Sequence, residues 1–142
     1  MARIATAEWK GNLQEGEGKL AVGSGSFEGP YTYKSRFEEG SGTNPEELVG
    51  AAEAGCFTMA LALGLTENGT PAESLRTEAK VNLRNIDGVP TIASIALTTR
   101  GRVEGVDEAT FKELAAQMKE QCIISRALAG VNEITVDAAL EG

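Results

Sequence analysis

The hydrophobic and polar positions of this chain alternate in several short stretches and become almost continuously apolar in one long stretch. The long stretch runs from Thr43 to Leu65. It begins with a helix start signal, because Thr43 or Asn44 can cap the first turn and Pro45 suits a position whose N–H has no helical partner. A helix that is apolar nearly all round is buried in a core or in a membrane. The run falls short of the roughly 20 apolar residues of a membrane span and contains Glu53, so we expect a buried central core helix.

Short alternating stretches predict strands on both sides of this helix. They cover residues 4–9, 18–22 and 31–37 before the helix, and residues 75–85, 91–103 and 131–140 after it. Asp87-Gly88 is a turn signal between two of these stretches, which are expected to form a hairpin or to be neighbours in one sheet. A second helix, apolar on one face only, is expected over residues 107–121, and Asp107 can cap it.

This order of elements predicts an α+β fold, with mostly antiparallel sheets around the central helix, for a single domain over residues 1–142. The first residues contain no apolar run of signal-peptide length, so we expect a cytoplasmic protein. The net charge of −8 argues against a general affinity for nucleic acid or anionic lipid. We therefore expect neither a nucleic-acid partner nor a membrane.

The absence of certain residue types excludes several classes of catalytic mechanism and metal site. The chain has no histidine, which excludes Ser-His-Asp and Cys-His mechanisms. Two cysteines without histidine cannot build the usual zinc site, and no nucleotide-binding glycine motif is present, so we expect no metal and no cofactor. Cys56 and Cys122 remain as candidates for chemistry. Each can equally be a small core residue, and two cysteines in a reducing compartment do not imply a structural disulfide.

A reactive Cys56 would need a cation from another part of the chain. A cysteine reacts as the thiolate, and Cys56 lies too far along the helix to gain from its positive N-terminal end. Arg36, at the end of the third predicted strand, can supply the charge, because an arginine stays protonated when buried and holds a carboxylate in fork geometry. That carboxylate is Glu46 or Glu47. The pattern leaves both open, because one of them can simply cap the helix.

Three motifs in order carry a resemblance to a known family. They are Arg36-Phe37-Glu38, Thr43-Asn44-Pro45-Glu46-Glu47-Leu48 and Ala54-Gly55-Cys56-Phe57, and a late cysteine, Cys122, follows an amphipathic helix. The chain resembles the osmotically inducible protein C (OsmC) and organic hydroperoxide resistance (Ohr) family over nearly its whole length. Within that family it is most similar to the OsmC branch.

The resemblance implies a thiol-dependent peroxidase that reduces organic hydroperoxides to alcohols. It makes Cys56 the peroxidatic thiol and Cys122 the resolving thiol. It makes Arg36 the activating cation and Glu46 the residue that orients it. The implied cycle forms a Cys56 sulfenic acid, which condenses with Cys122 to a disulfide that a lipoyl-type dithiol then reduces. An apolar substrate pocket would be lined by Leu48, Phe57, Met59, Ile123 and Ile124. The alternative is a non-catalytic protein of the same fold that binds a small hydrophobic ligand.

The spacing of Glu46 and Cys56 predicts an intertwined homodimer. Ten residues of helix rise about 15 Å, which no glutamate side chain covers. A partner chain could bring its own Arg36 and Glu46 to Cys56, and a closed two-fold dimer would make two equal sites. A helix interrupted near Gly50 or Gly55 would instead allow a site within one chain.

Overall fold

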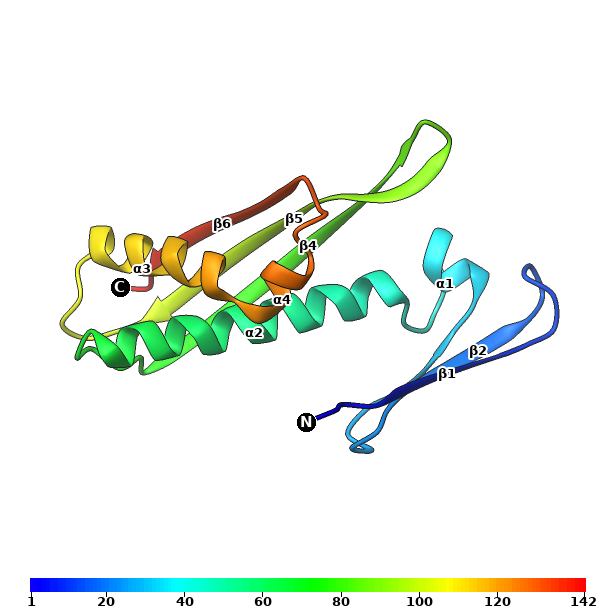
Figure 1. Cartoon of the computed structure of the whole chain (residues 1–142), viewed down its shortest axis with the longest axis horizontal. Coiled ribbons are helices and arrows are strands. Elements are labelled where there is room, and N and C mark those ends of the chain that lie inside the picture. The colour runs from blue at the N-terminus through cyan, green and yellow to red at the C-terminus, as the bar shows by residue number, and fades with distance from the viewer. The chain divides into compact units, whose positions relative to one another are not determined.

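The computed structural model describes residues 1–142, and the chain divides into two compact units, Met1–Leu48 and Val49–Gly142 (Figure 1). The α+β class is confirmed, with two separate three-stranded sheets and one long helix. The single domain over residues 1–142 stays a prediction.

The first unit is built on a small antiparallel sheet. Its strands are β1 (Ala5–Lys10), β2 (Glu17–Val22) and β3 (Glu28–Tyr31), in the order β1-β2-β3. Trp9 and Tyr31 pack edge to face with ring centroids 5.4 Å apart, which gives this sheet an aromatic contact between its outer strands. A short helix, α1 (Tyr33–Phe37), follows β3.

The third predicted strand is wrong over most of its length. Residues 31–37 were expected to be extended, but β3 ends at Tyr31 and the remainder is α1. A capping box starts this helix: the Ser35 N–H donates to Thr32 Oγ1 at 3.1 Å, and the Thr32 N–H donates to Ser35 Oγ at 2.8 Å. The alternation of aromatic and polar residues suggested a strand, but the same aromatic residues also fit a helix. Tyr33 and Phe37 are four positions apart, and their ring centroids lie 5.2 Å apart.

The second unit packs most of the long helix α2 (Pro45–Glu67) and the helix α3 (Glu108–Gln121) against a mixed sheet. Its strands are β4 (Ser74–Ile86), β5 (Val89–Arg102) and β6 (Glu133–Leu140), and its remaining helix is α4 (Ile123–Ala127). β4 and β5 form an antiparallel hairpin, whereas β6 pairs with β5 in parallel. Alternate residues of β5 are buried on one face: Ile95, Leu97, Thr99 and Gly101.

Several predicted ends and turns are confirmed. Asp87 and Gly88 both have positive φ (51° and 81°), as the expected two-residue hairpin turn requires. Asp107 caps α3, because its Oδ1 accepts the Thr110 N–H at 2.7 Å. This bond lowers the pKa of the Asp107 carboxyl below its ordinary value, since it favours the charged form.

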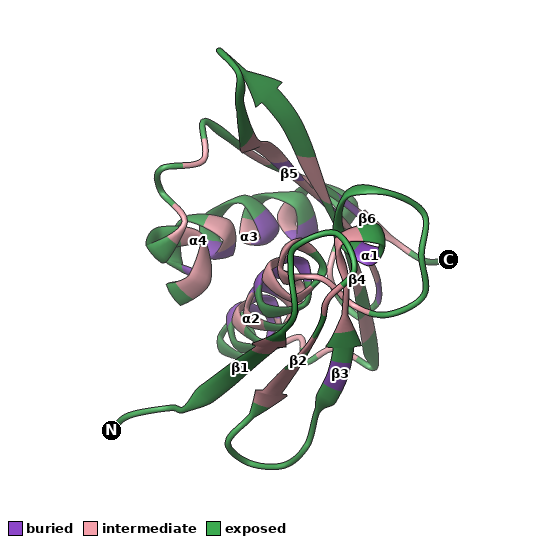
Figure 2. Cartoon of the chain, turned by 90° about the vertical axis from the view of Figure 1, so that its right-hand side faces the viewer, coloured by how far each residue is buried: buried purple, intermediate pink, exposed green.

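The long helix α2 (Pro45–Glu67) is confirmed, but it is buried on one face only. Its buried residues are Gly50, Glu53, Phe57, Leu61, Gly64 and Leu65. Met59 is 79% exposed and Leu63 is 56% exposed, and Figure 2 shows buried and exposed positions along the same helix. The expectation of a helix buried all round is therefore wrong for the single chain. By length and composition α2 could cross a membrane, a test that core helices of soluble proteins also pass.

The packing of β5 against α3 yields a stability prediction. An alanine at position 101 would place its Cβ 2.7 Å from Leu75 Cδ2 and 3.1 Å from Phe111 Cζ, closer than packed atoms normally come. We expect Gly101→Ala to lower the free energy of unfolding by about 1–3 kcal/mol, as overpacked core substitutions do. Urea unfolding measures it. Gly130→Ala is the matched control, because no atom lies within 4 Å of the added methyl group. Equal stability of the two variants would contradict this packing.

Candidate active site

The first group of predicted site residues is an ion pair at the junction of α1 and α2. Arg36 Nη2 donates to Glu46 Oε1 at 2.8 Å, and Arg36 Nε donates to the same oxygen at 3.1 Å. The Glu46 side chain is 15% exposed and that of Arg36 is 39% exposed. A planar arginine held at two of its donors has a fixed orientation, which a point charge would lack. Arg36 lies on α1, not at the end of a strand as predicted.

The choice between the two glutamates follows from their partners. Glu47 has a capping role: its N–H donates to Asn44 Oδ1 at 2.7 Å, and its carboxylate accepts the Thr43 hydroxyl at 2.9 Å. Asn44 also donates to the Ser35 carbonyl at 3.0 Å, which ties α1 to the start of α2. Glu46 is thus the carboxylate that pairs with Arg36, and Glu47 belongs to the helix start.

An apolar pocket adjoins Arg36 within the first unit. Its volume is about 450 Å³. It is lined by Trp9, Gly11, Leu13, Tyr31, Thr32, Arg36 and Phe37. The Arg36 guanidinium carbon lies 5.2 Å from the centre of the Phe37 ring, so the charge is also held against an aromatic face. Sequence reasoning missed this pocket, since its residues come from two stretches, 9–13 and 31–37, that meet only in the folded unit.

The second group of predicted site residues is the pair of thiols, both in the second unit. Both cysteines are free: Cys56 is half-buried on α2, and Cys122 is buried where α3 ends and α4 begins. Burial raises the pKa of the Cys122 thiol above its ordinary value, and the neighbouring Cys56 thiol and the charge of Glu53 raise that pKa further. The Ser125 N–H donates to Cys122 Sγ at 3.5 Å and opposes this shift. The two thiols therefore lie side by side in unequal surroundings.

Glu53 and Ser125 lie next to the thiols, and the sequence analysis did not predict either of them as a site residue. Glu53 is fully buried, and its Oε1 accepts the hydroxyl of Ser125, which lies on α4. Glu53 Oε2 is buried without a hydrogen-bond partner. The signal for Glu53 was present in the sequence, because it is the one charged side chain from Leu48 to Leu65. Nothing in the sequence alone marks Ser125.

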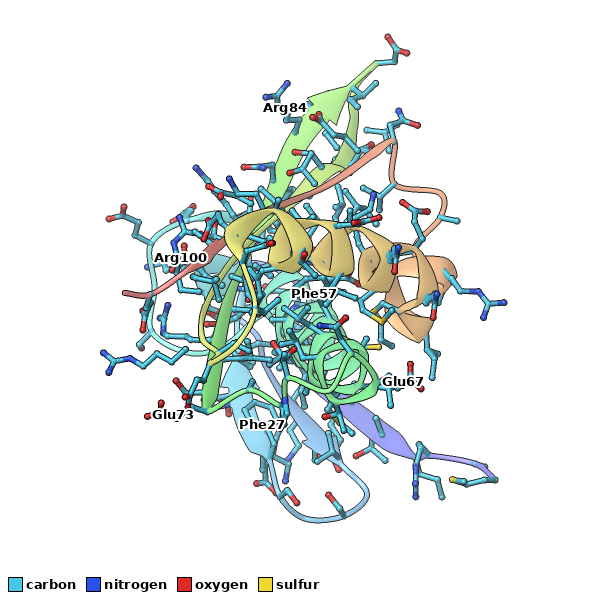
Figure 3. The ribbon with its side chains drawn as sticks, turned by 90° about the vertical axis from the view of Figure 1, so that its left-hand side faces the viewer. Phe27, Phe57, Glu67, Glu73, Arg84 and Arg100 are labelled. Atoms are coloured by element: carbon cyan, nitrogen blue, oxygen red, sulfur yellow. The ribbon has the colours of Figure 1, made fainter.

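The residues predicted to line a substrate pocket around α2 differ widely in burial, and the pocket itself stays a prediction. Phe57 is fully buried in the core between α2 and α3 (Figure 3), so it cannot line an open pocket. Met59 and Ile123 are largely exposed instead. No group of three or more Cys, Asp or Glu side chains is arranged to hold a metal ion.

Comparisons with known proteins agree on one family. The family model described as "OsmC-like protein" matches residues 38–137. The protein named Peroxiredoxin OsmC from Escherichia coli K12 is 41% identical over 136 residues, which cover 95% of this chain and 94% of that protein. An organic hydroperoxide resistance protein from Xanthomonas axonopodis pv. citri is 28% identical and covers 70% of this chain and 69% of its own length.

The fold is also that of solved structures. The crystal structure of an OsmC-like protein from Mycoplasma pneumoniae superposes with a TM-score of 0.77 at 17% identity, covering all of this chain and 99% of that one. The family model matches most of the sequence, and the identity to the Escherichia coli protein extends over nearly all of it. The chain therefore belongs to the OsmC-like protein family.

Proposed function

We propose that this protein is a cysteine-based peroxidase that reduces organic hydroperoxides to alcohols. The observation that carries the proposal is the pair of free, neighbouring thiols, one half-buried and one buried. The 41% identity to a protein named Peroxiredoxin OsmC supports it. The Xanthomonas relative, named for organic hydroperoxide resistance, supports the substrate class.

The unequal surroundings of the thiols support different roles for them. Cys56 is the thiol that solvent and peroxide can reach, so its thiolate attacks the distal oxygen of the hydroperoxide and releases the alcohol. Cys122 is buried, and its raised pKa favours the protonated thiol. It therefore reacts only after Cys56 has been oxidised to the sulfenic acid. The two then form a disulfide with loss of water. A dithiol of the lipoyl type reduces that disulfide and returns both thiols.

The Arg36–Glu46 pair activates the peroxidatic thiol in this proposal. A fixed guanidinium favours a thiolate and also the negative charge that develops on the peroxide oxygen. Glu46 holds the arginine in place through its two-point contact. The aromatic pocket beside Arg36 suits the organic group of the substrate, because its apolar walls adjoin the charge that would meet the peroxide.

The active form in this proposal is a two-fold homodimer. α2 runs without a break from Pro45 to Glu67, so the alternative of a helix interrupted at Gly50 or Gly55 is wrong. On a continuous helix, the ten residues from Glu46 to Cys56 correspond to a rise of roughly 15 Å. The exposed apolar face of α2, with Met59 and Leu63, is available to a second copy. The partner's Arg36 and Glu46 would then complete each site.

A second candidate function is the binding of a small hydrophobic ligand without turnover. The pocket beside Arg36 is the observation that favours it. The two neighbouring thiols favour the peroxidase, since ligand binding has no use for them. We place the protein in the cytosol, where a reducing environment keeps both thiols available between turnovers.

The roles of the thiols predict two distinct variants. Cys56→Ser should abolish reduction of cumene hydroperoxide, because no nucleophile remains. Cys122→Ser should reduce one equivalent and then lose activity through overoxidation, because its sulfenic acid has no resolving partner. Mass spectrometry after peroxide treatment should find a Cys56–Cys122 disulfide in the wild type. Full turnover by Cys56→Ser would refute the assignment, and thiols that stay free would favour the binding protein.

Loss of the activating charge is the next prediction. Arg36→Ala should slow peroxide reduction by about 10²- to 10³-fold, as removal of one stabilising donor does in other active sites. Arg36→Lys should recover little, because a point charge cannot hold Glu46 in a fork. Arg102→Ala is the matched control, since Arg102 is exposed and pairs with Glu141. A wild-type rate in Arg36→Ala would contradict the role.

Subunit mixing tests the shared site. A dimer of one Cys56→Ser chain and one Arg36→Ala chain keeps one complete site if the site combines two chains, so it should regain about half of the wild-type activity. If each chain builds its own site, both sites of the mixed dimer are damaged. Native mass spectrometry confirms that subunits have exchanged. Exchanged but inactive mixtures would refute sharing.

A further inference from the structure

The starting point is a buried carboxyl group that the proposed mechanism has not used. Glu53 is fully buried on the inward face of α2, forms no ion pair, and leaves Oε2 without a hydrogen-bond partner. Oε2 is the one buried side-chain oxygen or nitrogen in this condition. Such an atom is unfavourable by about 1–3 kcal/mol, and an apolar side chain would avoid that loss. The position therefore calls for an explanation beyond packing.

The contacts of Glu53 lead to both thiols. Ser125 donates its hydroxyl to Glu53 Oε1 and its backbone N–H to Cys122 Sγ, so one residue bridges the carboxyl group and the buried thiol. Glu53 lies three positions before Cys56 on α2, and residues at this spacing are neighbours on one side of a helix. The charge of Glu53 also acts on Cys122 directly, since it contributes to the raised pKa of that thiol.

The step in which the Cys122 thiol attacks the Cys56 sulfenic acid needs a proton acceptor near Cys122. Cys122 is 1% exposed, so water cannot readily take its proton. The chain has no histidine, and Glu53 is the one carboxyl group among its buried residues. The hydroxyl of a sulfenic acid is also a poor leaving group unless a proton reaches it. One carboxyl group beside both sulfur atoms can meet both needs.

We propose that Glu53 carries the proton when the Cys56 sulfenic acid joins the Cys122 thiol. The Glu53 carboxylate accepts the proton of Cys122, and the thiolate sulfur attacks the sulfur of Cys56. The S–S bond forms as the S–O bond of the sulfenic acid breaks. The departing hydroxide takes the proton from Glu53 and leaves as water, so the carboxylate is restored and no other reactant is needed. Ser125 is the positioning residue that holds the carboxyl group through Oε1.

The inference rests on the proposed peroxidase function, and the experiment separates the two. Reduced protein is mixed with one equivalent of cumene hydroperoxide, and dimedone trapping and disulfide mass spectrometry follow the two steps in time. Glu53→Gln keeps the size of the side chain and the acceptor for Ser125 but cannot carry a proton. We expect sulfenic acid formation to continue and disulfide formation to slow by about 100-fold or more. Glu67→Gln, at the exposed end of α2 (Figure 3), is the control and should leave both steps unchanged.

A second pair of variants keeps the test valid if Glu53→Gln folds poorly. Glu53→Asp and Glu53→Asn leave the same space, but only the aspartate carries a proton. A merely structural role would treat them alike, whereas we expect the aspartate variant to close its disulfide at least about tenfold faster. Equal rates in this pair, or a wild-type rate in Glu53→Gln, would overturn the inference and leave the peroxidase standing. A wild-type protein that forms no disulfide would overturn both.

Discussion

The helical spacing of α2 is the constraint that relates the reactive groups along it. Glu46, Glu53 and Cys56 lie on one uninterrupted helix, so their separations are set by its rise and pitch. Three residues make Glu53 a neighbour of Cys56 on one side of the helix, whereas ten residues put Glu46 about two and a half turns away. In the proposals above, Glu53 serves the thiol of its own chain and Glu46 serves the thiol of a partner chain, and this difference in spacing supports that division. The proposed dimer follows from the same constraint.

Burial then separates the two thiols chemically. Phe57, Leu61 and Leu65 anchor the inward face of α2 in the core with residues of β5 and α3, and this holds Cys56 at the edge of that core. Cys122 lies inside it, where α3 ends. A thiol at the edge can meet a peroxide, and a thiol inside is protected until its neighbour is oxidised. The order of events in the proposed cycle therefore follows from the unequal burial of the two thiols.

Much of the fold was predictable because its strongest signals are local. The Asp87-Gly88 turn and the Asp107 cap need only their own sequence neighbours, and both are confirmed. Residues 31–37 were assigned wrongly because Tyr33 and Phe37 fit periods of two and of four equally well, and the Thr32–Ser35 capping box decides between them. For the site, sequence and resemblance pointed to four residues, whose pairings are visible as Arg36 with Glu46 and Cys56 beside Cys122. Ser125 and the aromatic pocket depend on contacts between distant segments, which no local pattern reveals.

Position 53 shows how a site can be distinguished from a core. Folding alone favours an apolar residue there, since Glu53 Oε2 is buried without a partner and every other buried residue of α2 is apolar or glycine. In a chain without histidine, a buried carboxyl group is one of the few groups that can accept a proton and return it to a neighbour. The unfavourable burial of Glu53 is therefore explained if its carboxylate accepts a proton during the reaction. The thiol of Cys122, which Ser125 links to Glu53, is the proposed source of that proton.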